Sequence, residues 1–184
     1  ACWLSISRIA RSTNAGTAGP AHLARLVTWL DGTPLAEAGP NPANLRSLGG
    51  VLGRLDRALG SLGHAGAHRD FEWDLRSTPQ VRGRLHAIQD PERRALVEAI
   101  VGRYEARVAP VLGGLRHGVI HNDPNDWNVL VTGDAVTGLI DFGDALHAPV
   151  IADLAVACAY AMLNQPSPVE AAAAIASGYD AVMP

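Results

Sequence analysis

The chain has 184 residues, of which 48% are hydrophobic and 18% charged, and its formal net charge is −3. This composition is typical of one globular domain with a single core and excludes a disordered chain. The weak negative charge gives no basic field for a phosphate backbone, so nucleic acid is not an expected partner. No apolar run reaches the roughly 18 residues of a membrane-spanning helix, and no membrane partner is expected. Sparse cysteines, Cys2 and Cys158, favour a reducing, cytoplasmic location over a disulfide framework.

Two β-prone segments open the chain, CWLSISRIA at 2–10 and HLARLVTWL at 22–30. A loop rich in Gly, Ser, Thr and Pro separates them, which predicts a pair of strands. DGTP at 31–34 predicts a turn. The opening segment has neither an initiating Met nor the features of a signal peptide, so we interpret the sequence as the interior of a longer chain.

Two helices are predicted next. Asn41 can cap the first, with Pro42 at its first position, and leucines spaced by three and four residues extend to about Gly63. Residues 64–80 have no regular pattern. Asp90 can cap the second helix, which ends at a pair of glycines. Its predicted buried face consists of Ile100, Tyr104, Val108 and Leu112.

The pattern then changes to short β-like segments: GVI at 118–120, NVLV at 128–131 and VTGLIDF at 136–142. A helix is predicted from Pro149 to Leu163, and another from Pro168 to about Ser177. Helices, then a short β-hairpin, then helices indicate an α+β fold that is mostly helical.

A polar loop, HNDPNDWN at 121–128, lies between the GVI and NVLV segments. Asp123 precedes Asn128 by five residues, and Asp141 follows thirteen residues later as the first residue of DFGD. This order of residues is the arrangement of a kinase catalytic loop. Asp123 can orient a hydroxyl and take its proton, while the oxygens of Asn128 and Asp141 suit Mg²⁺. His121 is expected to support the loop by hydrogen-bonding backbone rather than to react.

These motifs resemble the aminoglycoside phosphotransferase and choline kinase-like family, which shares the protein-kinase fold. HNDPNDWNVLV and GLIDFGDALHAPVIADLAVACAYAML look most similar to hydroxylysine kinase-like proteins, and they also resemble the kinase-like domains fused to class III aminotransferases. The resemblance extends from LVTWLDG to near the C-terminus. The second residue of the His-x-Asp triplet is usually Gly in this family, whereas here it is Asn122.

The resemblance implies a protein-kinase-like α+β fold in two parts. Residues 1–33 would form strands and the hinge of an incomplete N-lobe. Residues 34–184 would form a mostly helical C-lobe that carries the catalytic β-hairpin and lacks some C-terminal helices. ATP as phosphoryl donor and Mg²⁺ as its cation are implied together with this fold.

Several residues take expected roles from the same resemblance. In the hinge, backbone groups of Thr28 and Leu30 would pair with adenine. Leu130 and Ile140 would form the apolar floor beneath the base. Asp153, in the ADLA sequence, would brace the catalytic loop from below.

Four further side chains have candidate roles near the site. Asp126 and Asp144 can bind a second Mg²⁺ or a substrate ammonium, or they can be solvated or capping residues. Trp73 and Asp74 can line an acceptor pocket, and the alternative for Trp73 is packing in the core.

Kinase-type transfer also needs a Gly-rich loop and a Lys that hold the phosphates. The sequence contains no Lys, and only residues 1–26 precede the hinge. The 184-residue polypeptide alone is therefore expected to have little or no phosphotransferase activity.

Two functions from different classes remain open. In the first, the full-length parent is an ATP-dependent kinase for a hydroxyl of an amine-bearing metabolite, such as hydroxylysine, choline, ethanolamine or an aminoglycoside. In the second, the chain is a catalytically silent kinase-like module that binds nucleotide or substrate for an attached enzyme, such as an aminotransferase. The presence of Asp123, Asn128 and Asp141 favours the first, and the absence of Lys favours the second.

Overall fold

The structure, a computed structural model, describes residues 6–12 and 22–184. Strands β1 (Ile6–Ser12) and β2 (His22–Val27) pair antiparallel, which confirms the predicted strand pair for the residues described. Residues 2–5 of the first predicted strand lie outside the described part. β2 ends at Val27, before the predicted end, and residues 28–32 follow without regular secondary structure.

A three-stranded antiparallel sheet contains the β-hairpin that the sequence predicts. Its strands, in order, are β3 (Thr33–Pro34), β5 (Val129–Thr132) and β6 (Ala135–Leu139). Thr33 pairs with Val131, so the expected turn at 31–34 ends in a short strand on the hairpin. The hydroxyl of Thr137 strengthens this junction by donating to the carbonyl oxygen of Asp31 at 2.9 Å.

Two boundaries after this sheet differ from the sequence prediction. β6 ends at Leu139 instead of Phe142, because Asp141 adopts a left-handed conformation (φ 61°) and the 3-10 turn η3 (Phe142–Asp144) follows. Strand β7 (Leu146–Pro149) then pairs antiparallel with β4 (His117–Ile120). Pro149 therefore ends a strand and does not open a helix, and its missing N–H is tolerated because both strands of a two-stranded sheet are edges.

Helix α2 (Pro42–Leu59) follows the short helix α1 (Leu35–Ala38) and begins where the sequence predicts. Oδ1 of Asn41 accepts the N–H groups of Ala43 and Asn44, each at 2.9 Å, and the Asn41 N–H donates to Oδ1 of Asn44 at 2.8 Å. This reciprocal cap satisfies N–H groups that have no partner within the helix. The helix ends at Leu59, short of Gly63, and Leu62 beyond it is half exposed.

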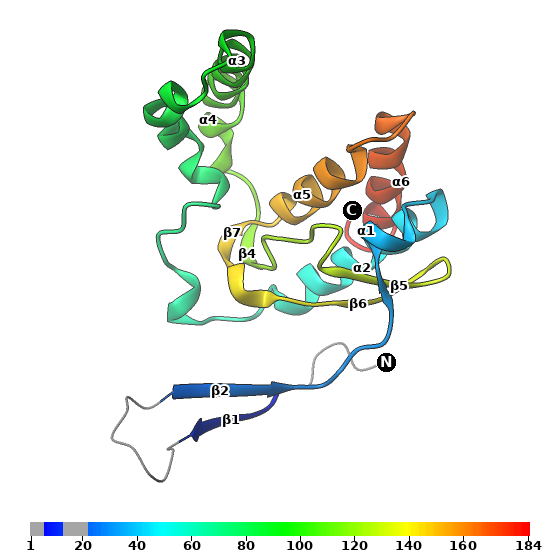
Figure 1. Ribbon diagram of the computed structural model, residues 1–184. Helices are drawn as coiled ribbons and strands as arrows, with labels where there is room; N and C mark the ends of the chain where they lie inside the picture. Colours follow the sequence, from blue (N-terminus) through cyan, green and yellow to red (C-terminus); the bar gives the residue numbers. More distant parts are fainter. Residues whose placement is uncertain (1–5, 13–21) are drawn as a thin grey trace.

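The residues between Gly60 and Arg116 form a separate layer of 3-10 helices and α-helices (Figure 1). The elements are η1 (Ala65–Ala67), η2 (Leu75–Ala87), α3 (Pro91–Arg107) and α4 (Ala109–Leu112). The Asp90 cap of α3 is confirmed. Tyr104 and Leu112 are buried as expected, but Ile100 is 55% exposed and Val101 is buried instead. The reason is that α3 packs against η2 and not against the main core.

The main core lies where α2, α5 (Ile151–Met162) and α6 (Pro168–Asp180) pack around the β5–β6 hairpin (Figure 1). Leucines of the predicted α2 stripe fill it together with side chains of β5 and α6; the most buried are Leu48, Leu52, Val129 and Ile175. A second cluster lies beneath β4 and β7 and includes Ile120 and Leu146. Within the described residues, no helix is both long and apolar enough to cross a membrane.

Helices α2 and α6 approach so closely that they require glycine at the contact. A Cβ added at Gly49 would lie 1.9 Å from the carbonyl oxygen of Ile175, and one added at Gly178 would lie 2.0 Å from that of Arg46. Both distances are far inside van der Waals contact, and the obstacles are backbone atoms that cannot rotate away. The two glycines therefore set the position of α6 against α2.

Candidate active site

The polar loop begins at the end of β4 and lies over the buried carboxylate of Asp153. Asp153 on α5 is fully buried, and its two oxygens accept the backbone N–H groups of His121 at 2.9 Å and Asn122 at 2.6 Å. Asp153 thus lies directly beneath the loop. Asn122 has a φ of 69°, a left-handed conformation that Gly adopts freely and Asn adopts more readily than most residues. This backbone geometry accounts for Asn at a position where the resemblance leads us to expect Gly.

The imidazole of His121 bonds backbone groups on two segments. Nε2 lies 2.9 Å from the carbonyl oxygen of Ile140, which can only accept, so this nitrogen carries the ring proton. Nδ1 can then accept the N–H of Asp123, at 3.3 Å. Burial lowers the pKa of His121, and the neutral ring is the form that these two bonds need. The side chain joins the loop to the segment that precedes Asp141.

Two side-chain amides hold one oxygen of the Asp123 carboxylate. Nδ2 of Asn125 donates to Oδ2 of Asp123 at 2.9 Å, and Nδ2 of Asn128 donates to the same oxygen at 3.1 Å. Asn128 also donates to the Asp123 carbonyl oxygen at 2.9 Å. Oδ1 of Asn125 accepts the backbone N–H groups of Trp127 and Asn128, at 2.8 and 3.1 Å. The carboxylate is therefore oriented through Oδ2, and Oδ1 is the oxygen that can take a proton from a bound hydroxyl.

Asn128 and Asp141 meet at the open end of the hairpin. The N–H of Ile140 donates to the carbonyl oxygen of Asn128 at 3.0 Å, so Asp141, the next residue, emerges beside Asn128. Oδ1 of Asp141 accepts the N–H of Gly143 at 3.1 Å, which fixes the carboxylate at the start of η3. Because the nitrogen of the Asn128 amide faces Asp123, its oxygen faces the opposite side.

This donor set fits Mg²⁺. One carboxylate and one amide oxygen are hard ligands, and Mg²⁺ is usually held by one or two carboxylates together with substrate phosphates. In the part of the chain that the structure describes, no three His, Cys, Asp or Glu side chains gather into a metal site of their own. Asn128 and Asp141 would thus hold the ion together with a nucleotide.

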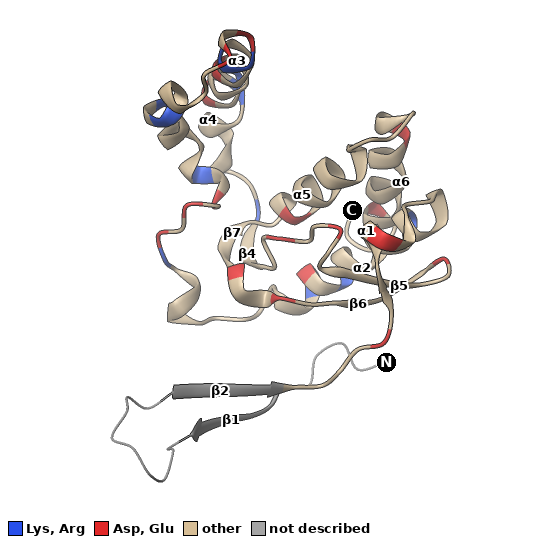
Figure 2. Cartoon of the chain, in the orientation of Figure 1, with Lys and Arg blue, Asp and Glu red and all other residues tan. Residues whose placement is uncertain are grey.

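Acidic residues mark the loop after β4 and the segment after β6 (Figure 2). Burial raises the pKa of Asp144, and the negative charges of Asp123 and Asp141 raise it further, while the Arg69 guanidinium opposes them. Nη2 of Arg69 donates to the carbonyl oxygen of Gly143 at 2.7 Å. The three carboxylates therefore share one electrostatic neighbourhood, which favours a bound cation.

The segment after β2 lies on the hairpin at the expected floor of the base site. A Cβ added at Gly138 would lie 2.8 Å from Cδ1 of Leu30 and 3.5 Å from Cδ1 of Leu130, so these two leucines lie around one glycine. Ile140 is 38% exposed, whereas Leu130 is buried. Thr28 lies in the exposed segment between β2 and β3.

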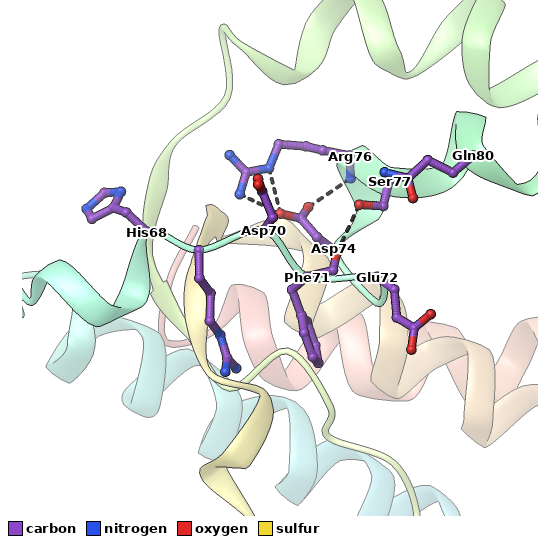
Figure 3. Close-up of a pocket in the computed structure, with 9 residues that line it drawn as sticks. His68, Asp70, Phe71, Glu72, Asp74, Arg76, Ser77 and Gln80 are labelled. Atoms are coloured by element: carbon purple, nitrogen blue, oxygen red, sulfur yellow. Dashed lines mark hydrogen bonds and ion pairs between the residues drawn. The ribbon is translucent and has the colours of Figure 1, made fainter.

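An open cavity of about 740 Å³ lies along residues 68–80, beside the loop (Figure 3). Asp74 lines it, but its carboxylate is paired with Arg76, whose Nε donates at 2.8 Å. Trp73 is 71% exposed, so the alternative of core packing is wrong, and its side chain is not among those that line the cavity. The carbonyl oxygen of Trp73 accepts from Nδ2 of Asn122 at 3.5 Å, which joins the segment that carries the lining residues to the loop.

Two residues of the site were not identified from the sequence. The Asn125 side chain holds the Asp123 carboxylate. The sequence contained a signal for Asn125, because Asn often forms a turn in which its side chain accepts backbone N–H groups two and three residues ahead. Asp56 on α2 is buried at 1% exposure next to Asp153. It lies in an otherwise apolar stripe of leucines, and no local pattern indicates its partner.

Solved structures with the same fold are kinases of small molecules. An amicoumacin kinase in complex with AMP-PNP and Ca²⁺ superimposes with a TM-score of 0.62 at 16% identity, covering 96% of this chain and 53% of that one. An aminoglycoside-3'-phosphotransferase of type VIII superimposes with a TM-score of 0.53 at 27% identity, covering 89% and 63%. The chain therefore has the protein-kinase-like α+β fold.

The sequence profile of the phosphotransferase enzyme family matches residues 6–184, and the chain belongs to this family. It is 29% identical to the hydroxylysine kinase of Bos taurus over 186 residues, which cover 94% of this chain and 50% of that protein. The chain thus spans about half the length of the curated relatives that it matches.

Proposed function

We propose that the intact protein transfers the γ-phosphoryl group of ATP to a hydroxyl of an amine-bearing small molecule. Family membership and the similarity to hydroxylysine kinase support a small-molecule phosphotransferase. One observation carries the proposal: Asn125 and Asn128 both hold Oδ2 of Asp123, which orients the carboxylate next to Asp141. A loop that merely turned the chain would not need this arrangement.

In the proposed reaction, the acceptor hydroxyl oxygen forms a bond to the γ-phosphorus, and the bond from that phosphorus to the β,γ-bridging oxygen breaks. Oδ1 of Asp123 takes the hydroxyl proton, and ADP leaves with the bond electrons. The carboxylate contributes orientation and proton transfer, each of which depends on its being held in place. His121 remains neutral throughout and keeps the loop in register with the segment before Asp141.

We infer that Mg²⁺ and the nucleotide occupy the hairpin end. Bound there, Mg²⁺ would supply charge neutralisation for the phosphates. Asn128 and Asp141 have the oxygens that it prefers, and Leu30 and Leu130 offer an apolar surface for adenine. The AMP-PNP and Ca²⁺ of the amicoumacin kinase complex support a nucleotide and a divalent cation in this fold. An ATP-dependent reaction and sparse cysteines together favour the cytoplasm.

The cavity along residues 68–80 is our candidate for the acceptor site. It lies next to the catalytic loop, since the backbone carbonyl of Trp73, between the lining residues Glu72 and Asp74, accepts from the Asn122 side chain. Asp70 and Glu72 line it with exposed carboxylates, which can bind an ammonium group, although Glu72 is also paired with Arg84 at 3.4 Å; Arg69 adds a cation. Hydroxylysine, choline, ethanolamine and an aminoglycoside are therefore the acceptors to test first.

The test is release of ADP from ATP or of GDP from GTP, together with phosphorylated product, from the intact protein with Mg²⁺ and each of these acceptors. Asp123→Asn removes the proton acceptor and is expected to lower kcat by about 10²–10⁴-fold. Asp180→Asn, an exposed carboxylate on α6, serves as the matched control and should retain activity. Equal rates in the wild type and Asp123→Asn would overturn the assignment of Asp123.

A second candidate is a nucleotide- or substrate-binding module without transfer activity, attached to another enzyme. The observation that favours it is the absence of Lys from these 184 residues, so this chain supplies no lysine to bridge the phosphates. Nucleotide binding with no product for any acceptor, in wild type and Asp123→Asn alike, would favour the module. The coding region on both sides of this sequence would then be searched for an aminotransferase domain.

A further inference from the structure

Two buried carboxyl groups meet beneath the catalytic loop. Asp153 on α5 is 0% exposed, and Asp56 on α2 is 1% exposed. Each carboxyl group acts on the pKa of the other, so the two groups are close neighbours. Oδ2 of Asp56 accepts the hydroxyl of Tyr179 on α6 at 2.6 Å. Helices α2, α5 and α6 pack together (Figure 1), and one side chain from each takes part in this polar cluster.

The hydrogen bonds around this pair leave one atom without a partner. Both oxygens of Asp153 accept backbone N–H groups of the loop, and Oδ2 of Asp56 accepts from Tyr179. Oδ1 of Asp56 is buried and, among the described residues, has no donor. Two ionised carboxylates in contact away from water are strongly unfavourable, and a buried acceptor without a donor is unfavourable as well. One proton between the carboxyl groups removes both penalties at once.

We propose that Asp56 and Asp153 share one proton, and that Asp56 is thereby a positioning residue for the catalytic loop. The proton joins Asp56 to Asp153, and Asp153 holds the N–H groups of His121 and Asn122. Tyr179 fixes the far side of Asp56, and the close contact of α6 with α2 at Gly49 and Gly178 fixes Tyr179. The position of α6 is in this way transmitted to the residues before Asp123.

The electrostatic environment agrees with a shared proton. Burial is the largest cause that raises the pKa of Asp56 and of Asp153, and the charge of Asp56 raises that of Asp153 further. Burial and Asp56 also raise the pKa of Tyr179, so its hydroxyl remains a donor. Arg116 acts on Tyr179 in the opposite direction, and His121 faces the pair through its backbone N–H. The pair titrates as a unit, and its proton is lost only above the ordinary range of an Asp.

The direct test follows the backbone N–H signals of His121 and Asn122 by NMR in the intact protein, from about pH 4 to about pH 9. Both protons are bonded to Asp153, so both signals should move together, with a midpoint above the ordinary Asp value of 3.8. Asp56→Asn removes the second carboxyl group and supplies an amide donor to the Asp153 carboxylate, so the midpoint should move to clearly lower pH than in the wild type. Any transition due to the His121 ring should remain. Asp180→Asn is the control and should titrate like the wild type.

Two results would overturn the proposal: a wild type whose two signals show no transition above 3.8, or an Asp56→Asn protein that keeps the wild-type transition. If Asp56→Asn does not fold, Tyr179→Phe gives a second test. It removes the donor that stabilises the charged form of Asp56, so the midpoint should rise by about one pH unit. An unchanged midpoint in this variant would count against the shared proton.

The positioning role of Asp56 rests on the proposed function. It is measured by enzyme kinetics, separately from the NMR titration that tests the shared proton. Asp56→Leu removes the bond to Asp153 and is expected to lower kcat with little change in KM, whereas Asp56→Asn restores kcat. Equal kcat values for the Leu and Asn variants would overturn the positioning role. If the wild type shows no transfer at all, the proposed function fails, while the NMR titration still decides the shared proton.

Discussion

The backbone N–H of Ile140 donates to the carbonyl oxygen of Asn128 at 3.0 Å. This bond extends the β5–β6 ladder beyond Val129 and Leu139, the pair at the open end of the hairpin. Asn128 and Asp141 therefore leave the same end of one rigid element, although thirteen residues separate them. A site built on paired strands is held more firmly than one built on loops alone.

Removal of either oxygen ligand at this end should weaken Mg²⁺-dependent nucleotide binding. For Asp141→Asn and Asn128→Ala, the Mg²⁺ concentration that gives half-maximal nucleotide binding should rise about tenfold or more, because one of the protein's ligands to the ion is weakened or lost. Calorimetric titration of the nucleotide at a series of Mg²⁺ concentrations measures it. Asp134→Asn, in the exposed turn of the same hairpin, is the control. A midpoint that is unchanged in both variants would show that the ion is held elsewhere.

Asn125 should matter for turnover more than for binding. Asn125→Ala removes one donor to Asp123 and the acceptor of two loop N–H groups, so kcat should fall about 10–100-fold while the KM for nucleotide changes little. Asn125→Asp keeps the acceptor but replaces the donor with a like charge beside Asp123. Steady-state kinetics of the two variants should both show low kcat, and wild-type kcat in Asn125→Asp would contradict the role of the donor.

Glycines in α2 should respond to alanine in opposite ways. Gly49→Ala places a methyl group against the carbonyl oxygen of Ile175 and should lower the free energy of unfolding by about 3 kcal/mol or more. At Gly50 the nearest atom is the flexible end of Arg54, at 3.4 Å, so Gly50→Ala should raise stability by about 0.5–1 kcal/mol through helix propensity. Urea unfolding of the two variants compares neighbouring positions of one helix. Equal effects would show that α6 does not press on Gly49.

Stability should depend on pH through His121. Burial lowers its pKa below the ordinary 6.5, so the unfolded chain binds the proton more tightly than the folded one. The stabilisation is present above 6.5 and is lost as pH falls through the folded-state pKa. In the wild type this group contributes a slope of up to about 1.4 kcal/mol per pH unit. His121→Gln should remove that part of the slope in urea unfolding, and an identical slope in both proteins would contradict it.

His147 also has a lowered pKa, and its contribution must be separated from that of His121. Burial and the neighbouring His68 and His117 lower the pKa of His147, whose ring stacks on that of His68 at 4.5 Å between centroids. This contribution is common to the wild type and His121→Gln, so the difference between their slopes isolates His121.

Features that depend on neighbours in the chain were predictable from the sequence. The helix starts at Asn41 and Asp90 follow from side chains that cap N–H groups two or three residues away. The start of α6 at Pro168 follows from the fixed φ of proline. The candidate site was also largely local, because Asp123 and Asn128 belong to one loop. Asp141 joins them through a hairpin whose strands are short, apolar and β-prone.

Contacts between residues far apart in the sequence determined the features that could not be predicted. Val101 is buried in place of Ile100 because α3 packs against η2, which no helical periodicity specifies. Pro149 ends a strand because β4 lies beside it. The sequence by itself determined the polar loop at 121–128 and the family motif. Only the tertiary structure decided that Asp56 lies against Asp153 beneath that loop, because burying two carboxyl groups together depends on how α2, α5 and α6 pack and not on the residues adjacent to either one.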